Sequence, residues 1–286
     1  MTAPRILVVN ADDFGLTPGV CRGILQAHSE GIVTSTSALV AAPAFDSHAG
    51  QLRDSGLAAG LHLCAVGEDP PLLTANEVPS LVDRRGRLPI SWKHFLRRAA
   101  RGQIDRDDLV REFEAQHAAL RGAGIVPTHV DSHQNLHLWP TVGAAAIALA
   151  ARHSIPVLRV TGTQQLGPVS AGVRLLGARL RRRARRAGLA VPDVAAGLDT
   201  AGDVDERRLR EMITQLGRRR GHADLTVHPG ADPDPDRTRY EWGYRWAAEL
   251  RAVCAPAVEE HVARNGLVLG SFREVAEAHV GPPPIS

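Results

Sequence analysis

The sequence has few cysteines and no long apolar run. Its three cysteines, Cys21, Cys64 and Cys254, are odd in number and far apart, which argues against a disulfide framework and against a cysteine metal site. A reducing cytoplasm is therefore the expected location. No segment reaches the roughly 18 to 20 uncharged apolar residues of a membrane span, and the N-terminus lacks the charged and apolar regions of a signal peptide.

The sequence also lacks a strong charge of either sign. The formal net charge is +3 over 286 residues, which is slight for a chain of this size. The dense basic run at 179–186 has no interleaved aromatic residues, so it indicates a solvated helix face rather than a nucleic-acid surface. Because no GxGxxG motif or P-loop is present, we expect neither a nucleotide cofactor nor a nucleic-acid partner.

What the sequence does contain is an alternation of apolar strands with helices. Strands are expected at 5–9, 32–40, 57–63, 128–133, 156–160, 223–228 and 267–272, and helices at 17–30, 43–54, around 95–98, 107–122, 140–153, 204–216 and 250–265. Such alternation implies a parallel sheet. About seven strands favour a TIM-like (β/α) barrel, complete or incomplete, over a flat doubly wound sheet.

Two long segments interrupt this alternation. They lie at 65–108 and 161–202, and segments of this length in a compact fold are usually lids or covers over a functional site. The hydrophobic content of 44% is sufficient for a sizeable core. We therefore expect one barrel domain over 1–286 with two lid-like insertions.

An acidic pair, Asp12 and Asp13, follows the first expected strand. Burying either carboxylate costs several kcal/mol unless it is paired, hydrogen-bonded or bound to a metal. We expect one of them to be a metal ligand and the other a general base. The alternative is an Asp-rich turn that caps the following helix.

Other ionisable residues lie on the expected strands or at their carboxyl ends, where the active site of either fold lies. They are His62, His129, Asp131, His133, Arg159 and His228. Because residues two apart in a strand share a face, His129, Asp131 and His133 are expected to point the same way. Imidazole and carboxylate without thiolate suit a catalytic zinc or related divalent ion with three protein ligands and an open water position.

Six segments of the chain, taken in order, resemble the YdjC-like family of carbohydrate deacetylases, which includes chitooligosaccharide deacetylases and hopanoid-associated sugar deacetylases. The segments are 9–16, 31–36, 60–63, 128–133, 228–230 and 269–273. The resemblance implies a TIM-like barrel and a divalent metal held by Asp13, His62 and His133. It also implies that Asp12, beside the ligand, is the base.

One feature departs from the family pattern. Family members commonly carry several alternating histidines after Asp-Ser-His, whereas here Gln134 and Asn135 precede His137. The three implied ligands are unaffected, but the substrate side of the site differs. His133 and His137 also have i, i+4 spacing, which is an alternative ligand pair if this segment is helical.

The expected reaction is metal-dependent hydrolysis of an N-acetyl group on an amino sugar or its conjugate, with release of acetate. Asp12 would take the proton of water, and His228 would protonate the departing amine. His129 and Asp131 would orient the ligands, and Arg159 and His137 would bind substrate or lie behind the ligands. Zinc is the favoured ion, with magnesium or another divalent ion as alternatives.

Two other functions are compatible with the same residues. One is another metal-dependent hydrolase or sugar isomerase on this barrel, which shares the metal but not the product. The other is a catalytically silent sugar-binding protein. The sequence is also compatible with a homo-oligomer.

Overall fold

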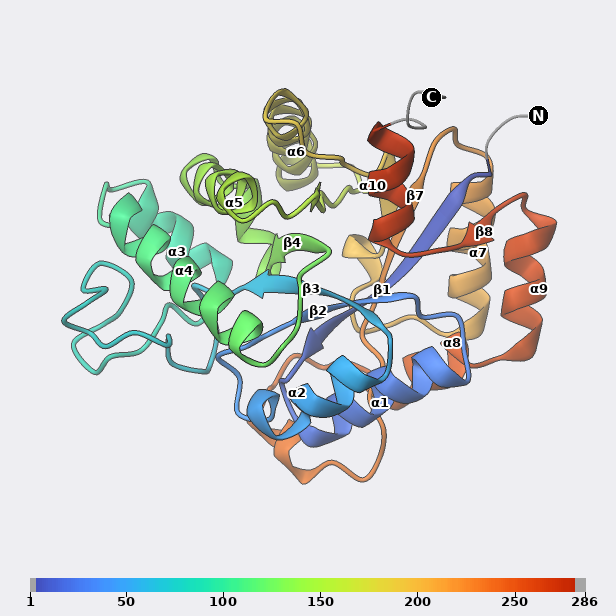
Figure 1. Cartoon of the computed structure of the whole chain (residues 1–286), viewed down its shortest axis with the longest axis horizontal. Coiled ribbons are helices and arrows are strands. Elements are labelled where there is room, and N and C mark those ends of the chain that lie inside the picture. Colours follow the sequence, from blue (N-terminus) through green and yellow to red (C-terminus); the bar gives the residue numbers. More distant parts are fainter. Residues whose placement is uncertain (1–3, 281–286) are drawn as a thin grey trace, which may run out of the picture.

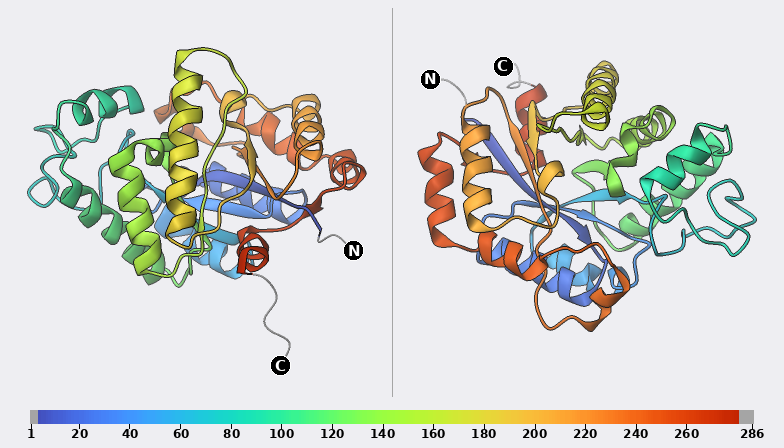
Figure 2. Two further views of the ribbon diagram at one scale, coloured as in Figure 1. Left: turned by 90° about the horizontal axis from the view of Figure 1, so that it is seen from above. Right: turned by 180° about the vertical axis from the view of Figure 1, so that it is seen from behind.

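The computed structural model describes residues 4–280 and has a curled parallel sheet at its centre (Figures 1 and 2). The strand order is β5-β4-β3-β2-β1-β7-β6, and β8 pairs with the start of β1. The strands are β1 (Ile6–Phe14), β2 (Ser35–Ala38), β3 (Ala58–Leu63), β4 (His129–Ser132), β5 (Val157–Leu158), β6 (Val194–Ala196), β7 (Ala223–Val227) and β8 (Val268–Leu269). Their carboxyl ends therefore meet at one rim.

The two ends of the sheet lie close together. A single parallel bridge joins Val157 of β5 to Ala190, just before β6, and the Leu158 N–H donates to the Ala190 carbonyl at 3.0 Å. The sheet thus curls back on itself without a full ladder at the seam. The prediction of a TIM-like barrel is confirmed in its incomplete form.

Helices surround the sheet, as both views in Figure 2 show. They are α1 (Pro18–Ser29), α2 (Phe45–Asp54), α3 (Trp92–Ala99), α4 (Arg106–Gly122), α5 (Pro140–Arg152), α6 (Pro168–Arg186), α7 (Glu206–Gly217), α8 (Trp246–Val253), α9 (Pro256–Arg264) and α10 (Phe272–Val280), with 3-10 helices η1 (His133–Leu138), η2 (Leu198–Thr200) and η3 (Pro235–Arg239). Local signals start several of them. Thr17, for example, caps α1 by accepting the Val20 N–H, and Pro18 takes the first helical position.

Three sequence expectations about the elements were wrong in detail. The helix expected at 250–265 is two helices, because Pro256 has no N–H to continue α8 and instead begins α9. The segment 161–202 is not simply a lid, since it contains α6 and the strand β6, whose three residues are too few to show a period. The first strand runs on to Phe14, so the acidic pair lies inside it.

The segment 64–91 runs through turns and bends along the outside of α4. Its backbone is tied to that helix by buried carboxylates. Glu112 accepts the N–H groups of Leu72 and Leu73 at 2.9 and 3.0 Å, and Asp108 accepts the Ser80 N–H at 2.7 Å. The excursion is therefore anchored to the barrel although it has no regular structure of its own.

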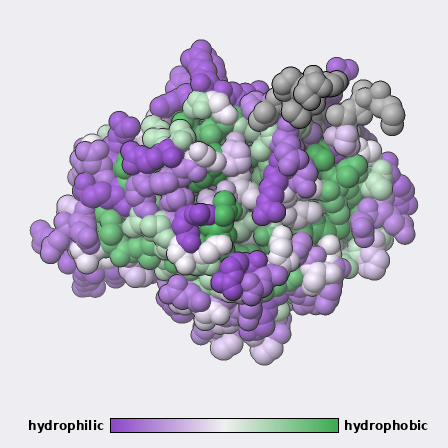
Figure 3. Space-filling view, in the orientation of Figure 1, coloured by the Kyte–Doolittle hydropathy of each residue, from purple (hydrophilic) through white to green (hydrophobic). Residues whose placement is uncertain are grey.

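The basic run 179–186 lies on the C-terminal half of α6. Leu180 and Ala184 are buried, and most of the arginines between and beyond them are exposed, which is the pattern of a solvated helix face. Hydrophilic residues also form most of the outline of the face in Figure 3.

All three cysteines are free. Among residues 4–280, no helix combines the length and apolarity needed to cross a bilayer.

Candidate metal centre

Asp12 and Asp13 both line one cleft because β1 is irregular at this point. In a regular strand, adjacent side chains point to opposite faces. Asp13 has a φ of 71°, and the pairing of β1 with β2 shifts register between Ala11 and Phe14. A bulge of this kind re-aims a side chain, and here it brings two neighbouring carboxylates to the same cavity.

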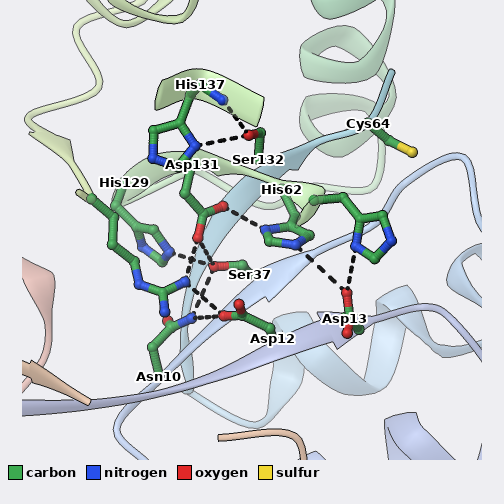
Figure 4. A network of polar contacts seen from close by, with 12 residues as sticks. Asn10, Asp12, Asp13, Ser37, His62, Cys64, His129, Asp131, Ser132 and His137 are labelled. Carbon is green, nitrogen blue, oxygen red and sulfur yellow. Dashed lines mark hydrogen bonds and ion pairs between the residues drawn. The ribbon is translucent and has the colours of Figure 1, made fainter. Parts of the chain in front are cut away.

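Asp13 lies beside two histidines from other elements, His62 of β3 and His133 at the start of η1. Its Oδ1 lies 3.5 Å from His62 Nε2 (Figure 4). The same oxygen lies 3.1 Å from His133 Nδ1. The three side chains are buried, and their ligand atoms lie within 4.8 Å of one another. One carboxylate and two imidazoles that open on a cleft match the three protein ligands of a catalytic zinc site.

The tautomer of His62 suits a ligand. Its Nδ1 lies 2.6 Å from Asp131 Oδ1, so Nδ1 carries the proton and Nε2 faces Asp13, as in carboxylate-histidine-metal arrangements. Burial lowers the pKa of His62, but the charge and hydrogen bond of Asp131, together with the charges of Asp12 and Asp13, raise that pKa to about 9. Burial likewise opposes ionisation of Asp13, yet the hydrogen bond and charge of His133 lower the pKa of Asp13 to about 2.

Three clusters among residues 4–280 could hold an ion: Asp13, His62 and His133; Asp12, His62 and Asp131; and Glu114, His117 and His153. In the second cluster both carboxylates are already paired with Arg159. In the third, Glu114 is paired with Arg152 at 2.8 Å and with His153 at 2.6 Å. The first cluster lines the cleft with a carboxylate that no arginine neutralises, so it fits a metal best.

Arg159 lies behind the cleft, among three buried carboxylates. Its Nη1 lies 2.6 Å from Asp12 Oδ1 and 2.5 Å from Asp131 Oδ2, and its Nε lies 2.8 Å from Asp224 Oδ2. Burial raises the pKa of Asp224 to about 6, although the Arg159 charge opposes this shift. Arg159 does not line the cleft and lies behind Asp12 and Asp131, so this geometry offers it no direct contact with a molecule in the cleft.

Replacing Arg159 with methionine is expected to lower the free energy of unfolding by about 3 to 5 kcal/mol, because it leaves buried carboxylates without their cation. The measurement is urea denaturation followed by circular dichroism. Arg152→Met is the matched control, since Arg152 pairs with Glu114 on the surface and should cost less than about 1 kcal/mol. Equal losses in the two variants would contradict this account.

Ser37 links His129 to Asp131, the partner of His62. The Ser37 hydroxyl lies 2.9 Å from Asp131 Oδ2, 2.9 Å from His129 Nε2 and 2.9 Å from Asn10 Nδ2, which donates to it. The Ser37 hydroxyl donates its single proton to Asp131 Oδ2. It therefore accepts a hydrogen bond from His129 Nε2. Burial lowers the pKa of His129 to about 3, so this imidazole is neutral. Sequence reasoning missed Asn10, although it lies two residues before Asp12 and therefore on the same strand face.

His137 turns away from the cleft. Gln134 and Asn135 have φ values of 51° and 54°, which interrupt the helical path after His133. His137 Nδ1 instead lies 2.8 Å from the Ser132 hydroxyl. The i, i+4 ligand pair of His133 and His137 therefore does not form, while Gln134 and Asn135 line the cleft.

His228 follows β7 directly and lines the cleft. Within the described chain its buried Nδ1 has no hydrogen-bond partner, and Glu249 Oε2 lies 3.9 Å away. Glu249, on α8, is fully buried and accepts the backbone N–H of His228 at 2.5 Å and that of Val204 at 3.2 Å. Burial raises the pKa of Glu249, and the His228 charge opposes that rise. Sequence reasoning missed this carboxylate because nothing local links it to His228.

The cleft has a volume of about 450 Å³ and an aromatic wall. This wall is formed by Trp242 and Tyr244. Tyr240 and Trp246 flank them in the sequence and pack against them, with ring centroids 5.2 to 6.2 Å apart. Trp242 also packs 5.3 Å from the His133 ring. This wall was missed, yet both tyrosines of the chain and two of its four tryptophans fall at 240–246 with a period of two.

The residues of the candidate metal centre and its cleft all lie in parts of the chain that match known proteins. A family profile described as YdjC-like protein matches residues 6–264. A carbohydrate deacetylase of Geobacillus stearothermophilus is 30% identical over 273 residues, which cover 95% of this chain and 98% of the relative. A carbohydrate deacetylase of Enterococcus faecalis V583 is 36% identical over 155 residues, and this match spans only 57% of the relative and 53% of this chain.

A solved structure from Enterococcus faecalis V583 is similar in fold. Its name proposes a cellobiose-phosphate cleavage protein, and it superposes with a TM-score of 0.79 at 26% identity, covering 96% of this chain and 100% of that chain. The shared fold therefore includes both the curled sheet and the rim where the acidic pair and the histidines meet.

Proposed function

This chain belongs to the YdjC-like family, and from that premise we propose that it hydrolyses the N-acetyl group of an amino sugar or amino-sugar conjugate. The observation that carries the proposal is the convergence of Asp13, His62 and His133 beside Asp12 in one cleft. The relative from Geobacillus stearothermophilus, named a carbohydrate deacetylase, matches over nearly its full length and supports the same reaction. The products are acetate and the free amine.

We assign Asp13, His62 and His133 to the metal, and zinc as the ion, because two imidazoles and a carboxylate suit it better than they suit magnesium. When bound, the ion would polarise the acetyl carbonyl and lower the pKa of a bound water toward about 7. The nearby Asp131 holds the His62 ring in the required tautomer.

Asp12 is the proposed general base. Its Oδ1 accepts hydrogen bonds from Arg159 at 2.6 Å and from Asn10 at 2.7 Å, and within residues 4–280 no such bond is made by its Oδ2. That oxygen is free to take the proton of the attacking water as the new carbon–oxygen bond forms. Because Arg159 and Asn10 hold the other oxygen, the carboxylate is oriented before substrate arrives.

His228 is the proposed general acid. It lines the same cleft as Asp12, so it can give a proton to the amine nitrogen as the carbon–nitrogen bond breaks. The ring lies against Tyr244, with centroids 4.9 Å apart. The aromatic wall of Trp242 and Tyr244 offers apolar faces to a sugar ring, and Trp92 lies on the rim of the same cavity.

Acetate release tests the proposed function. The purified protein is freed of metal, reloaded with zinc, magnesium or manganese in turn, and incubated with N-acetylglucosamine, its β-linked oligomers and its alkyl glycosides. We expect metal-dependent acetate release from at least one of these sugars, with zinc most active. The proposal is wrong if no N-acetylated sugar releases acetate with any of the ions.

Exchanging Glu249 for glutamine is expected to lower kcat by about tenfold, because the proposed acid His228 loses the carboxylate that lies 3.9 Å from its Nδ1. Glutamine can still accept the His228 backbone N–H, so KM should change little. Glu259→Gln on α9 is the control, since that carboxylate is exposed. A kcat equal to that of wild type in Glu249→Gln would remove Glu249 from a positioning role.

A further inference from the structure

A second cavity adjoins the catalytic cleft, and its lining is chemically different. It has a volume of about 460 Å³ and lies between α3, η1 and α6. We call it the apolar groove. Its main lining side chains are Leu96, Leu136, Leu138, Trp139, Val173 and Leu176. The catalytic cleft, in contrast, is lined largely by carboxylate, imidazole, hydroxyl and amide groups.

The groove and the cleft adjoin each other and share part of their lining. Trp92, Gln134, Asn135 and Leu198 line both cavities. Gln134 and Asn135 are the residues that replace histidines of the family pattern, and their left-handed backbone puts them at this junction. A single molecule can therefore occupy both cavities, with one part beside Asp13 and another against the leucines.

Several of the polar groups that line the groove are already used by the protein. Asp199 accepts the Thr163 hydroxyl at 2.6 Å and the Gln164 N–H at 2.7 Å. Gln134 Oε1 accepts the Trp92 N–H at 2.7 Å. Since these acceptors are engaged and the rest of the lining is mainly apolar, a polar sugar would lose its hydrogen bonds to water in the groove with little in return.

We propose that the apolar groove is a subsite for an alkyl or aryl group carried by the amino sugar, so that the substrate is an apolar glycoconjugate rather than a free oligosaccharide. This inference rests on the proposed deacetylation. The volume lies within the range of about 300 to 1,000 Å³ usual for small-molecule sites, and burial of apolar ligand surface supplies the selectivity.

The first test compares two substrates. Acetate release by the zinc-loaded protein is measured for N-acetylglucosamine and for octyl 2-acetamido-2-deoxy-β-D-glucopyranoside, below the concentration at which the latter forms micelles. We expect kcat/KM to be at least about tenfold higher for the octyl conjugate. Equal values for the two substrates in the wild-type protein would overturn the subsite.

Variants of α6 locate the effect. Val173→Asp and, as a milder change, Leu176→Gln are expected to bring the ratio of the two kcat/KM values close to one. Leu175→Gln is the matched control, because Leu175 is on the same helix but outside the groove and 54% exposed, and it should keep the wild-type ratio. A ratio that stays at the wild-type value in both groove variants would contradict the assignment.

A binding measurement separates this inference from the proposed function. Octyl β-D-glucopyranoside has no acetyl group, and its binding is followed by calorimetry. We expect binding to wild type and to Leu175→Gln, and at least about tenfold weaker binding to Val173→Asp. If this holds but no sugar releases acetate, the deacetylase proposal fails and the groove stands. If acetate is released without a preference and without octyl glucoside binding, the groove fails alone.

A second copy of the chain is the competing occupant. Light scattering after size-exclusion chromatography is therefore run on wild type and Val173→Asp. The groove would be an interface between copies, and the subsite would be overturned, if wild type is a dimer, Val173→Asp is a monomer, and octyl β-D-glucopyranoside does not displace the second copy from wild type. An oligomeric state that is the same in wild type and in Val173→Asp supports the subsite.

Discussion

Replacing Asp12 with asparagine is expected to lower kcat by about 10²- to 10⁴-fold, the usual contribution of a general base, while the metal stays bound. Asparagine has the same shape and can still accept from Arg159 and Asn10, as Asp12 Oδ1 does. It cannot take a proton from water. The measurements are acetate release for kcat and elemental analysis of the same preparation for metal content.

Asp46→Asn is the control for this substitution, because Asp46 is exposed on α2 and should keep full activity. Activity near the wild-type level in Asp12→Asn would remove Asp12 from the role of base. Loss of metal together with activity would make Asp12 a ligand and would reverse the assignment within the acidic pair.

Removing a ligand should abolish metal binding rather than only slow the reaction. Asp13→Asn and His133→Ala are each expected to weaken zinc binding more than about 100-fold, which exceeds the 10- to 100-fold usual for residues behind the ligands. Activity should fall in parallel with metal content. Competition of each variant with a zinc-binding dye measures the affinity.

His137→Gln distinguishes the two ligand sets that the sequence allows. The imidazole of His137 is bonded to Ser132 and lies outside the cleft, so the variant should keep its metal. If instead His137→Gln loses zinc while His133→Ala keeps it, the assignment to His133 is wrong. Full metal occupancy in Asp13→Asn, His62→Ala and His133→Ala would refute the whole site.

The metal affinity should also depend on pH in a stated direction. Without metal, Asp131 raises the pKa of His62 to about 9 against the effect of burial, so near pH 7 the ring holds a proton that binding must displace. Affinity should therefore fall as pH decreases below 9, by about tenfold per unit for one proton. A flat dependence between pH 7 and 9 would contradict the protonated state of His62.

The fold gives the two carboxylates of the acidic pair different surroundings, which is the basis for the two chemical roles we propose for them. Asp12 is held by a buried arginine, which neutralises it and fixes one oxygen. Asp13 has no arginine partner and lies between two imidazoles. The same two side chains in a surface turn would be equivalent, and the assignment of base and ligand follows from these different neighbours.

Much of the fold could be predicted from the sequence because strand and helix patterns are local. The apolar runs ending at Val9 and Leu63, and the alternation His129, Asp131 and His133, depend on neighbouring residues alone. Parallel strands then bring their carboxyl ends to one rim. For this reason the residues of the candidate metal centre could be proposed before their distances were known, and the family resemblance indicated which of them to propose as ligands.

What only the tertiary structure decided depends on contacts between distant segments. The bulge at Asp13 arises from its pairing with β2, Arg159 meets Asp224 across 65 positions of sequence, and β6 exists because Val194 pairs with Ala223. The pattern of side chains along a single segment does not indicate which distant residues that segment will contact. The sequence by itself therefore determined the barrel class and the residue types at its rim, whereas packing decided which carboxylate is held by arginine and placed an apolar groove beside the cleft.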